Sequence, residues 1–256
     1  MGEKLKLNYN FYLFFISLFT QSTVLRTFKK YSKYPIMSLY IYFCTNYYMD
    51  QITTLRFGIS LCFFWISLEY LLKNQNKKYL FFIFIASLFH ISSIVLFILP
   101  FILKVRKIER WLIVFGIIFI LFRTPIFLFL IQFSSKLKGY YMEDKVNINF
   151  LILLENILIY IGSKILLNKG KDKNRLFLNL KIIEIYFLIL SFDMYFLTRI
   201  KNFFSISTYI LVPEIYYQSK KKTKVLLIII FYFLIRFIVV CLKTDYCNYT
   251  NYLINF

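Results

Sequence analysis

Long apolar runs separated by short polar breaks dominate the chain. Each run is close to the roughly 17–25 residues that a helix needs to cross the core of a bilayer. Tyr79–Leu103, for example, has His90 as its only strongly polar member, and a helix that is apolar all round needs apolar surroundings on every side. We therefore predict an all-α, polytopic transmembrane helical bundle, a single integral membrane domain over residues 1–256 that lies in the lipid bilayer. The nine predicted membrane segments are 9–25, 34–49, 52–72, 79–103, 111–133, 150–167, 176–196, 200–217 and 223–242.

The breaks between these runs differ in charge, which predicts the side of the membrane that each one faces. Under the positive-inside rule, short loops rich in Lys and Arg stay in the cytoplasm. Four strongly basic breaks are therefore expected on the cytoplasmic side, at 26–33, 73–78, 169–175 and 220–224. Three nearly neutral breaks are expected outside, at 50–56, 134–149 and 193–199.

The number of crossings between two of the basic breaks does not fit this rule. The breaks 73–78 and 169–175 are both basic, yet three predicted segments separate them, and the break 104–110 is basic as well. Either 79–103 enters and returns on the same side, breaking near His90–Ser93, or one basic loop departs from the rule. Non-helical backbone is tolerated at membrane depth where protein or a wet cavity surrounds it, so the sequence leaves both alternatives open.

Composition adds a net charge of +20, from 32 Lys and Arg against 12 Asp and Glu. Such a charge invites a nucleic-acid partner, but the basic residues lie in the breaks and not along one helix face, so we predict no nucleic-acid partner. The four cysteines lack the spacing of metal ligands, and the chain has no glycine-rich phosphate loop. We therefore predict no metal and no cofactor.

Ionisable residues inside the apolar runs are the candidates for chemistry, because they are costly in a membrane unless they have a function or a partner. Some have a structural interpretation. Lys181 and Glu184 are three residues apart and Glu69 and Lys73 are four apart, which are the spacings of pairs on one helix face. The full set is Arg56, Glu69, His90, Arg123, Glu155, Lys164, Lys181, Glu184, Asp193, Arg199 and Arg236.

Arg56 lies in the first turn or so of a helix predicted to begin near residues 50–54. A cation at the positive end of the helix dipole is unfavourable unless an anion joins it, and that end is a ready anion site. Thr53, Arg56, Ser60 and Ser67 fall on one stripe of this helix, which is suited to line a cavity. The alternative is an interfacial arginine that pairs with Asp50 or with a lipid phosphate.

Arg199 repeats this arrangement at the start of the eighth run, on the same predicted outer side. Two arginines at two helix starts suit a diphosphate, because guanidinium binds phosphate oxygens in pairs. The alternative is that Arg199 pairs with Asp193. His90 is a candidate general base, because histidine titrates near working pH; the alternative is that it hydrogen-bonds a nearby serine.

Three stretches carry a family resemblance. They are TLRFGIS at 54–60, ASLFHISS at 86–93 and TRIKNFF at 198–204, the last followed by a proline at 213. Together they resemble the EpsG family of bacterial membrane proteins, which are regarded as Wzy-like polymerases of exopolysaccharide and capsule repeat units. Two positions depart from the family pattern, since Phe57 stands in place of a Gln and Phe203 in place of a Tyr.

The resemblance implies a multi-pass protein of the bacterial cytoplasmic (inner) membrane that acts on oligosaccharides linked to undecaprenyl diphosphate. Its outer face would join repeat units into exopolysaccharide, capsule or O-antigen, in company with other polysaccharide-assembly proteins. Arg56, Ser60 and Arg199 would bind the diphosphate, the two arginines would stabilise charge on the leaving group, and His90 would act as the catalytic base.

Two other functions stay open on the sequence. One is a lipid-linked sugar flippase or a small-solute transporter. The sequence argues against this function, because it has no inverted repeat and no pair of helices broken by Gly or Pro. The other is an inactive, truncated family copy, because family members usually have earlier membrane segments and an outer loop with an Asp motif that nothing here matches.

Overall fold

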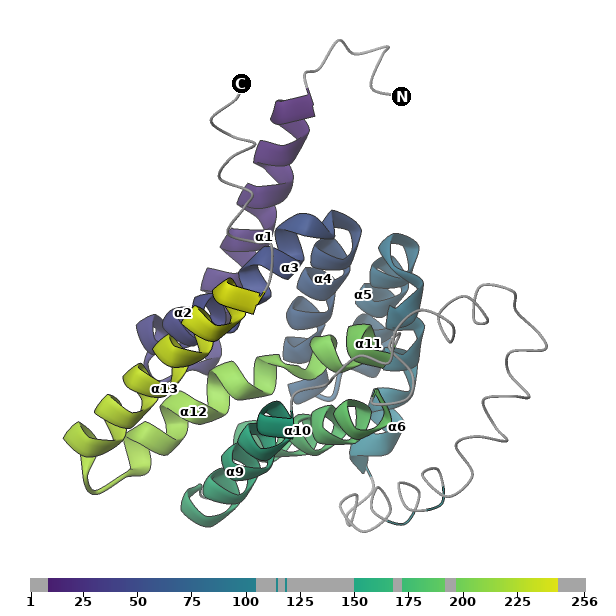
Figure 1. Cartoon of the computed structure of the whole chain (residues 1–256). Helices are drawn as coiled ribbons and strands as arrows, with labels where there is room; N and C mark the ends of the chain where they lie inside the picture. Colours follow the sequence, from purple (N-terminus) through teal and green to yellow (C-terminus); the bar gives the residue numbers. More distant parts are fainter. Residues whose placement is uncertain are drawn as a thin grey trace.

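A computed structural model describes residues 9–104, 114, 118, 150–167, 172–191 and 197–243. Every regular element in these ranges is a helix (Figure 1), which confirms the predicted all-α class. The elements are α1 (Tyr9–Tyr31), α2 (Pro35–Cys44), α3 (Tyr47–Thr53), α4 (Leu55–Leu72), α5 (Asn76–Phe89), the 3-10 helix η2 (Ile91–Ile98), α6 (Leu99–Lys104), α9 (Phe150–Leu166), α10 (Asp172–Leu190), α11 (Leu197–Phe204), α12 (Ile206–Gln218) and α13 (Lys222–Lys243).

Among the described residues, two helices are long and apolar enough to cross a membrane. They are α4 and the Lys222–Leu242 part of α13, of which only 11% is buried, and they match two of the nine predicted segments. Length and composition alone do not confirm the other seven. The predicted segment 111–133 lies outside the described residues, apart from 114 and 118, and so does the break 134–149.

Two predicted segments are wrong as single helices. The run 34–49 divides into the ten-residue α2 and the short α3. Asn46 between them has a left-handed backbone (φ 57°), which asparagine tolerates better than most residues and which stops a helix. The run 200–217 is likewise broken at Ser205, which separates α11 from α12. Both breaks lie within apolar sequence, so hydrophobicity alone does not reveal them.

The run 79–103 reverses direction at His90. His90 is extended (φ −147°, ψ 115°) between α5 and η2. The Tyr79 hydroxyl, in the first turn of α5, donates a 2.8 Å hydrogen bond to the carbonyl of Leu96 in η2. Because this bond joins the start of α5 to the late part of η2, η2 must run back along α5. The structure therefore shows the break near His90 that the first of the two alternatives requires, and the return of this run to its starting side of the membrane stays a prediction.

The first three basic breaks lie together at one end of the bundle. The Glu69 carboxylate pairs with Lys30 and, at 2.8 Å, with Lys73, which confirms the predicted Glu69–Lys73 pair. Lys173 donates a 2.9 Å hydrogen bond to the carbonyl of Tyr31, at the end of α1. These contacts join the ends of α1 and α4 to the start of α10.

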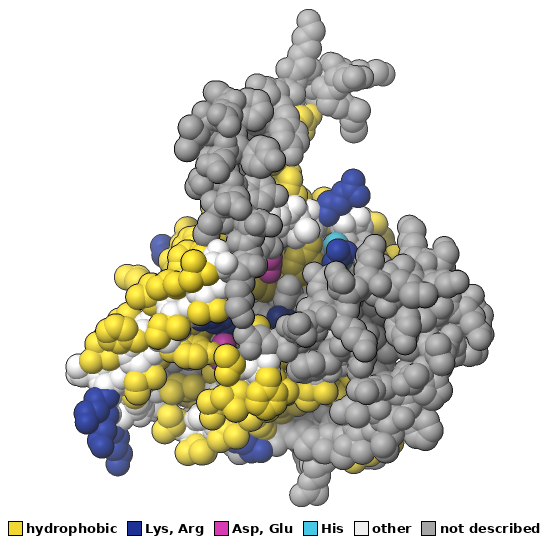
Figure 2. Space-filling model, viewed as in Figure 1, with side chains coloured by type: hydrophobic (Ala, Val, Ile, Leu, Met, Phe, Trp, Pro, Cys, Tyr) yellow, Lys and Arg dark blue, Asp and Glu magenta, His cyan; other side chains and the backbone are white. Residues whose placement is uncertain are grey.

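The fourth basic break joins the same end. The ammonium groups of Lys33 and Lys222 lie 5.4 and 5.9 Å from the centre of the Tyr217 ring, and Figure 2 shows dark-blue basic side chains gathered where α12 meets α13. The described residues of all four breaks expected on one side of the membrane therefore share one end of the bundle. Helix α4 has 18 residues, so its other end is about 27 Å away from the basic breaks.

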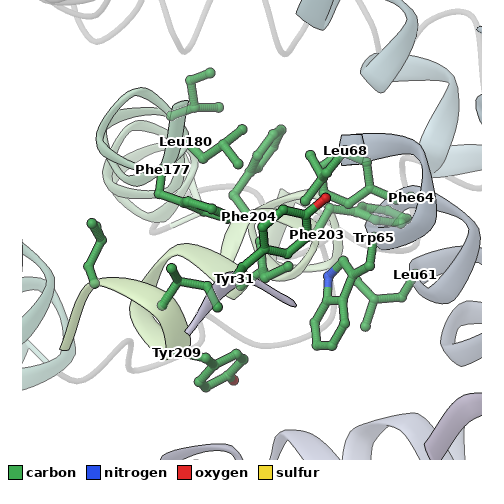
Figure 3. Packing of buried hydrophobic residues seen from close by; sticks show 14 of the residues in the cluster. Tyr31, Leu61, Phe64, Trp65, Leu68, Phe177, Leu180, Phe203, Phe204 and Tyr209 are labelled. Atoms are coloured by element: carbon green, nitrogen blue, oxygen red, sulfur yellow. The ribbon is translucent and has the colours of Figure 1, made fainter. Parts of the chain in front are cut away.

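An aromatic core fixes the helices between these ends. The ring of Phe28 in α1 lies 5.8 Å from Trp65 in α4 and 5.8 Å from Tyr209 in α12. Figure 3 shows Phe203 and Phe204, at the end of α11, within this cluster of buried side chains. Phe203 and Phe204 therefore anchor the end of α11 in this core.

Candidate functional site

A pocket of about 550 Å³ lies at the end of α4 that is opposite to the basic breaks. It is formed by the end of α3, the start of α4, the junction of α5 with η2, and α11. Figure 2 shows the cyan histidine beside dark-blue basic side chains in this region, near the upper ends of α4 and α5. The lining residues are Asp50, Thr53, Thr54, Leu55, Arg56, Phe57, His90, Thr198, Arg199 and Asn202.

The pocket brings together the three residues predicted to carry the chemistry. Arg56, His90 and Arg199 are far apart in the sequence, yet all three line it. Both arginines are exposed and lie in the first turns of their helices, since α4 begins at Leu55 and α11 at Leu197. Two guanidinium groups and two positive helix ends make this part of the pocket attractive to an anion.

The start of α4 has no side-chain cap. Thr54 is the N-cap residue but makes no capping hydrogen bond, because its hydroxyl donates to the backbone carbonyl of Asp50 instead. The first N–H groups of a helix have no partner within the helix. At α4, no side-chain cap from Thr54 covers these groups beside Arg56.

The imidazole of His90 is half-buried and held from two sides. Its Nδ1 is 2.6 Å from the Ser92 hydroxyl, and its ring packs edge to face against Phe57, with centroids 5.3 Å apart. The predicted alternative of a serine partner is therefore found, in a residue that also lines the pocket. In the tautomer in which Nδ1–H donates to Ser92, Nε2 carries the lone pair that a base needs.

Ser60, predicted to bind the diphosphate, does not line this pocket. It is fully buried, and its hydroxyl has no hydrogen-bond partner. Ser67 is also buried and donates to the carbonyl of Phe64 at 2.6 Å. The predicted stripe therefore divides: Thr53 and Arg56 face the pocket, while the serines further along α4 are inside the bundle.

The carboxylates proposed as partners of the arginines have different outcomes. Asp50 lines the pocket together with Arg56 and Arg199, so one acidic group shares the cavity with both cations. Asp193, the alternative partner of Arg199, lies outside the described residues, as does Arg123. A carboxylate beside two guanidinium groups leaves the pocket with an excess of positive charge.

Residues that the sequence did not single out complete the wall. Thr198 and Asn202 extend the α11 side of the pocket around Arg199. The helical spacing could have identified both residues. Asn202 is three residues after Arg199 and four after Thr198, which places all three on neighbouring positions of one helix face. Hydroxyl and amide groups at these positions can hydrogen-bond a polar ligand.

The two departures from the family pattern touch each other. The rings of Phe57 and Phe203 pack edge to face, with centroids 5.1 Å apart. Phe57 is 4% exposed and Phe203 is fully buried. An apolar contact between α4 and α11 therefore stands at two positions that the family pattern would make polar, and one of its members, Phe57, lines the pocket.

Other ionisable residues in the apolar runs are paired away from the pocket. The predicted Lys181–Glu184 pair is confirmed, at 3.0 Å and almost fully buried. Arg236 of α13 donates two hydrogen bonds to the carboxylate of Glu155 in α9. Within the described ranges, no three His, Cys, Asp or Glu side chains come together as a metal site requires, and the absence of a metal stays a prediction.

Comparison with known protein families gives a match. The model of the EpsG family matches residues 3–254, nearly the whole chain. No curated protein and no solved structure matches it.

Proposed function

The chain belongs to the EpsG family, and on this premise we propose that it polymerises lipid-linked oligosaccharide units into exopolysaccharide, capsule or O-antigen. The substrate would be carried on undecaprenyl diphosphate, at the outer face of the bacterial cytoplasmic membrane. The observation that carries the proposal is the convergence of Arg56, His90 and Arg199 in one pocket at two helix starts. Its volume of about 550 Å³ is ordinary for a small-molecule site.

In this proposal the protein crosses the membrane several times, with the basic end in the cytoplasm and the pocket outside. The length of α4, about 27 Å, is close to the roughly 30 Å core of a bilayer. Along α13, apolar side chains such as Phe231 and Ile235 are 58% and 59% exposed, and this surface suits lipid. The positive-inside rule then places the four basic breaks in the cytoplasm.

In the proposed reaction the anomeric carbon of the growing glycan leaves its diphosphate and bonds to a sugar hydroxyl of the next unit. The carbon–oxygen bond to phosphate breaks, and its electron pair stays on the diphosphate, where Arg56 and Arg199 stabilise the charge. Nε2 of His90 accepts the proton of the attacking hydroxyl. Asp50 and Asn202 would orient the sugar by hydrogen bonds to its hydroxyl groups.

The test removes each arginine in a strain that lacks its own polymerase and makes a matching substrate. Arg56→Ala and Arg199→Ala should each abolish polymer with protein levels near normal, while Arg26→Ala, at the basic end, should not. Arg→Lys should restore only part of the activity, because an ammonium loses the paired hydrogen bonds. The double variant should be little worse than either single one, as for residues that act together.

Full polymer from both single variants would refute this role for the arginines. In proteoliposomes the same protein should lengthen the glycan. Movement of the lipid-linked unit across the bilayer with no gain in length would instead indicate a flippase.

The orientation has its own test in intact cells. In a variant without the native cysteines, a membrane-impermeant thiol reagent should label Thr53→Cys, at the pocket, and leave Lys221→Cys unlabelled. The reverse pattern would place the pocket in the cytoplasm, and the outer-face mechanism would be wrong.

A further inference from the structure

A buried carboxylate lies where α11 joins α12. Glu184, in α10, is 3% exposed. One of its oxygens accepts a 3.1 Å hydrogen bond from Ser205, and the other accepts a 2.8 Å bond from Ser207. Ser205 is the single residue between α11 and α12, so Glu184 binds the chain at the break itself.

A second set of contacts holds Glu184 in place. Lys181, one turn earlier on α10 and fully buried, donates to Glu184 at 3.0 Å and also to Asn156 of α9 and Thr208 of α12. An ammonium group has three donors, and all three are used. The carboxylate therefore has a fixed position relative to α9, α10 and α12.

Stability alone does not account for this cluster. Taking two charges out of water costs about as much as their attraction returns, and apolar side chains of similar volume are often equally stable there. Apolar side chains would not fix the orientation of the chain at the break between α11 and α12. Hydrogen bonds to a charged group can do so, because they are strong and depend on geometry.

The helix that this cluster directs is short. α11 has eight residues, and a helix of about two turns has little stability by itself. Its first half brings Arg199 into the pocket, and its second half packs against Phe187, whose ring stacks on Phe204 with centroids 5.8 Å apart. Rotation of α11 about its own axis would move Arg199 out of the pocket, and the contact between Ser205 and Glu184 opposes that rotation.

We infer that Glu184 is a positioning residue, which acts through Ser205 to fix the rotation of α11 and so to present Arg199 to the pocket. The effect on polymer rests on the proposed function. The effect on the orientation of α11 does not, and it can be measured on the purified protein whatever the protein does.

The test uses thiol labelling of the full chain in detergent, without its native cysteines and with one new cysteine on α11. Thr198 lines the pocket and Ile200 is 6% exposed, so Thr198→Cys should react quickly and Ile200→Cys slowly. Glu184→Ala should bring the two rates together, changing their ratio by about tenfold or more, because it removes both serine hydrogen bonds to a charged group at the break.

The matched control is Glu155→Ala. Glu155 is another buried carboxylate, 6% exposed, but its partners Tyr232 and Arg236 lie on α13. This variant should keep the labelling ratio. An unchanged ratio in Glu184→Ala, or an equal change in Glu155→Ala, would overturn the inference.

A milder pair of variants decides the matter if Glu184→Ala does not fold. Ser205→Ala and Ser207→Ala each remove one hydrogen bond to Glu184, but only Ser205 lies at the break. Ser205→Ala should therefore change the ratio more than Ser207→Ala, and equal effects would contradict the inference. A changed ratio with normal polymer would contradict the proposed role of Arg199 and leave the positioning of α11 intact.

Discussion

Gly58 lies where α3 crosses the start of α4. A Cβ atom added there would be 2.9 Å from the backbone oxygen of Gln51, about 0.5 Å inside the 3.4 Å at which ordinary contact begins. Gln51 is 2% exposed, and its side-chain oxygen accepts a 2.6 Å hydrogen bond from the Tyr42 hydroxyl. Because the obstacle is backbone held in this way, Gly58→Ala should force α3 and α4 apart.

The size of this effect can be separated from helix propensity. Replacing glycine by alanine inside a helix gains about 1 kcal/mol, while overpacking a close contact costs about 1–3 kcal/mol. Gly162, inside α9, is the matched control, because among the described residues its added Cβ would meet Ile215 alone, at an ordinary 3.6 Å. The propensity gain is common to both, so Gly58→Ala should be less stable than Gly162→Ala by about 1–3 kcal/mol.

Thermal unfolding of the purified protein in detergent measures this difference. Each kcal/mol corresponds to about 2–4 °C in Tm for a chain of this size. Gly162→Ala should unfold at or above the temperature of the parent, and Gly58→Ala clearly below Gly162→Ala. Gln51→Ala should not rescue Gly58→Ala, because it leaves the backbone oxygen in place. Equal Tm values for the two glycine variants would refute the close-approach argument.

Two further predictions concern the pocket wall. His90→Ala should lower the rate of glycan elongation in proteoliposomes by about 100-fold or more, as for a lost general base. Ser92→Ala should lower this rate by less than about tenfold, because one hydrogen bond of about 1 kcal/mol is lost. Equal effects of the two variants would contradict the proposed roles. Phe57→Gln should destabilise the protein by about 1–3 kcal/mol through its unpaired buried amide. Adding Phe203→Tyr should recover part of this loss, and strict additivity in thermal unfolding would rule out the coupling.

Much of the pocket was predictable because its chemistry is local. Arg56 and Arg199 were identified from their positions at predicted helix starts, and His90 as the only strongly polar residue in its run. That the three share one pocket depends on how α4, α5 and α11 pack, which local sequence does not determine. Ser60 shows the limit, because helical spacing placed it on the stripe of Arg56, whereas packing turned it toward the inside of the bundle.

The sequence predicts the all-α class of the fold and the gathering of the basic loops at one end of the bundle. It predicts less well the points at which the helices are interrupted. The described residues of the four basic breaks share one end of the bundle, as their charge indicated. The sequence does not predict the turn at Asn46 or the break at Ser205, because apolar residues continue through both. The reversal at His90 was one of two alternatives, and the contact between Tyr79 and Leu96 that favours it joins residues 17 apart.

The reversal at His90 also bears on how the chain is made. α5 has 14 residues, η2 has 8 and α6 has 6, so the two arms of the hairpin are shorter than the roughly 17–25 residues of an ordinary membrane span. We expect the arms to leave the insertion machinery as a unit, already folded back, with the imidazole at the tip crossing the bilayer uncharged, because a charged side chain there is costly. The assembly of the pocket would then depend on the order in which α4, this hairpin and α11 enter the membrane during synthesis, and a slow step at the hairpin would delay the whole site.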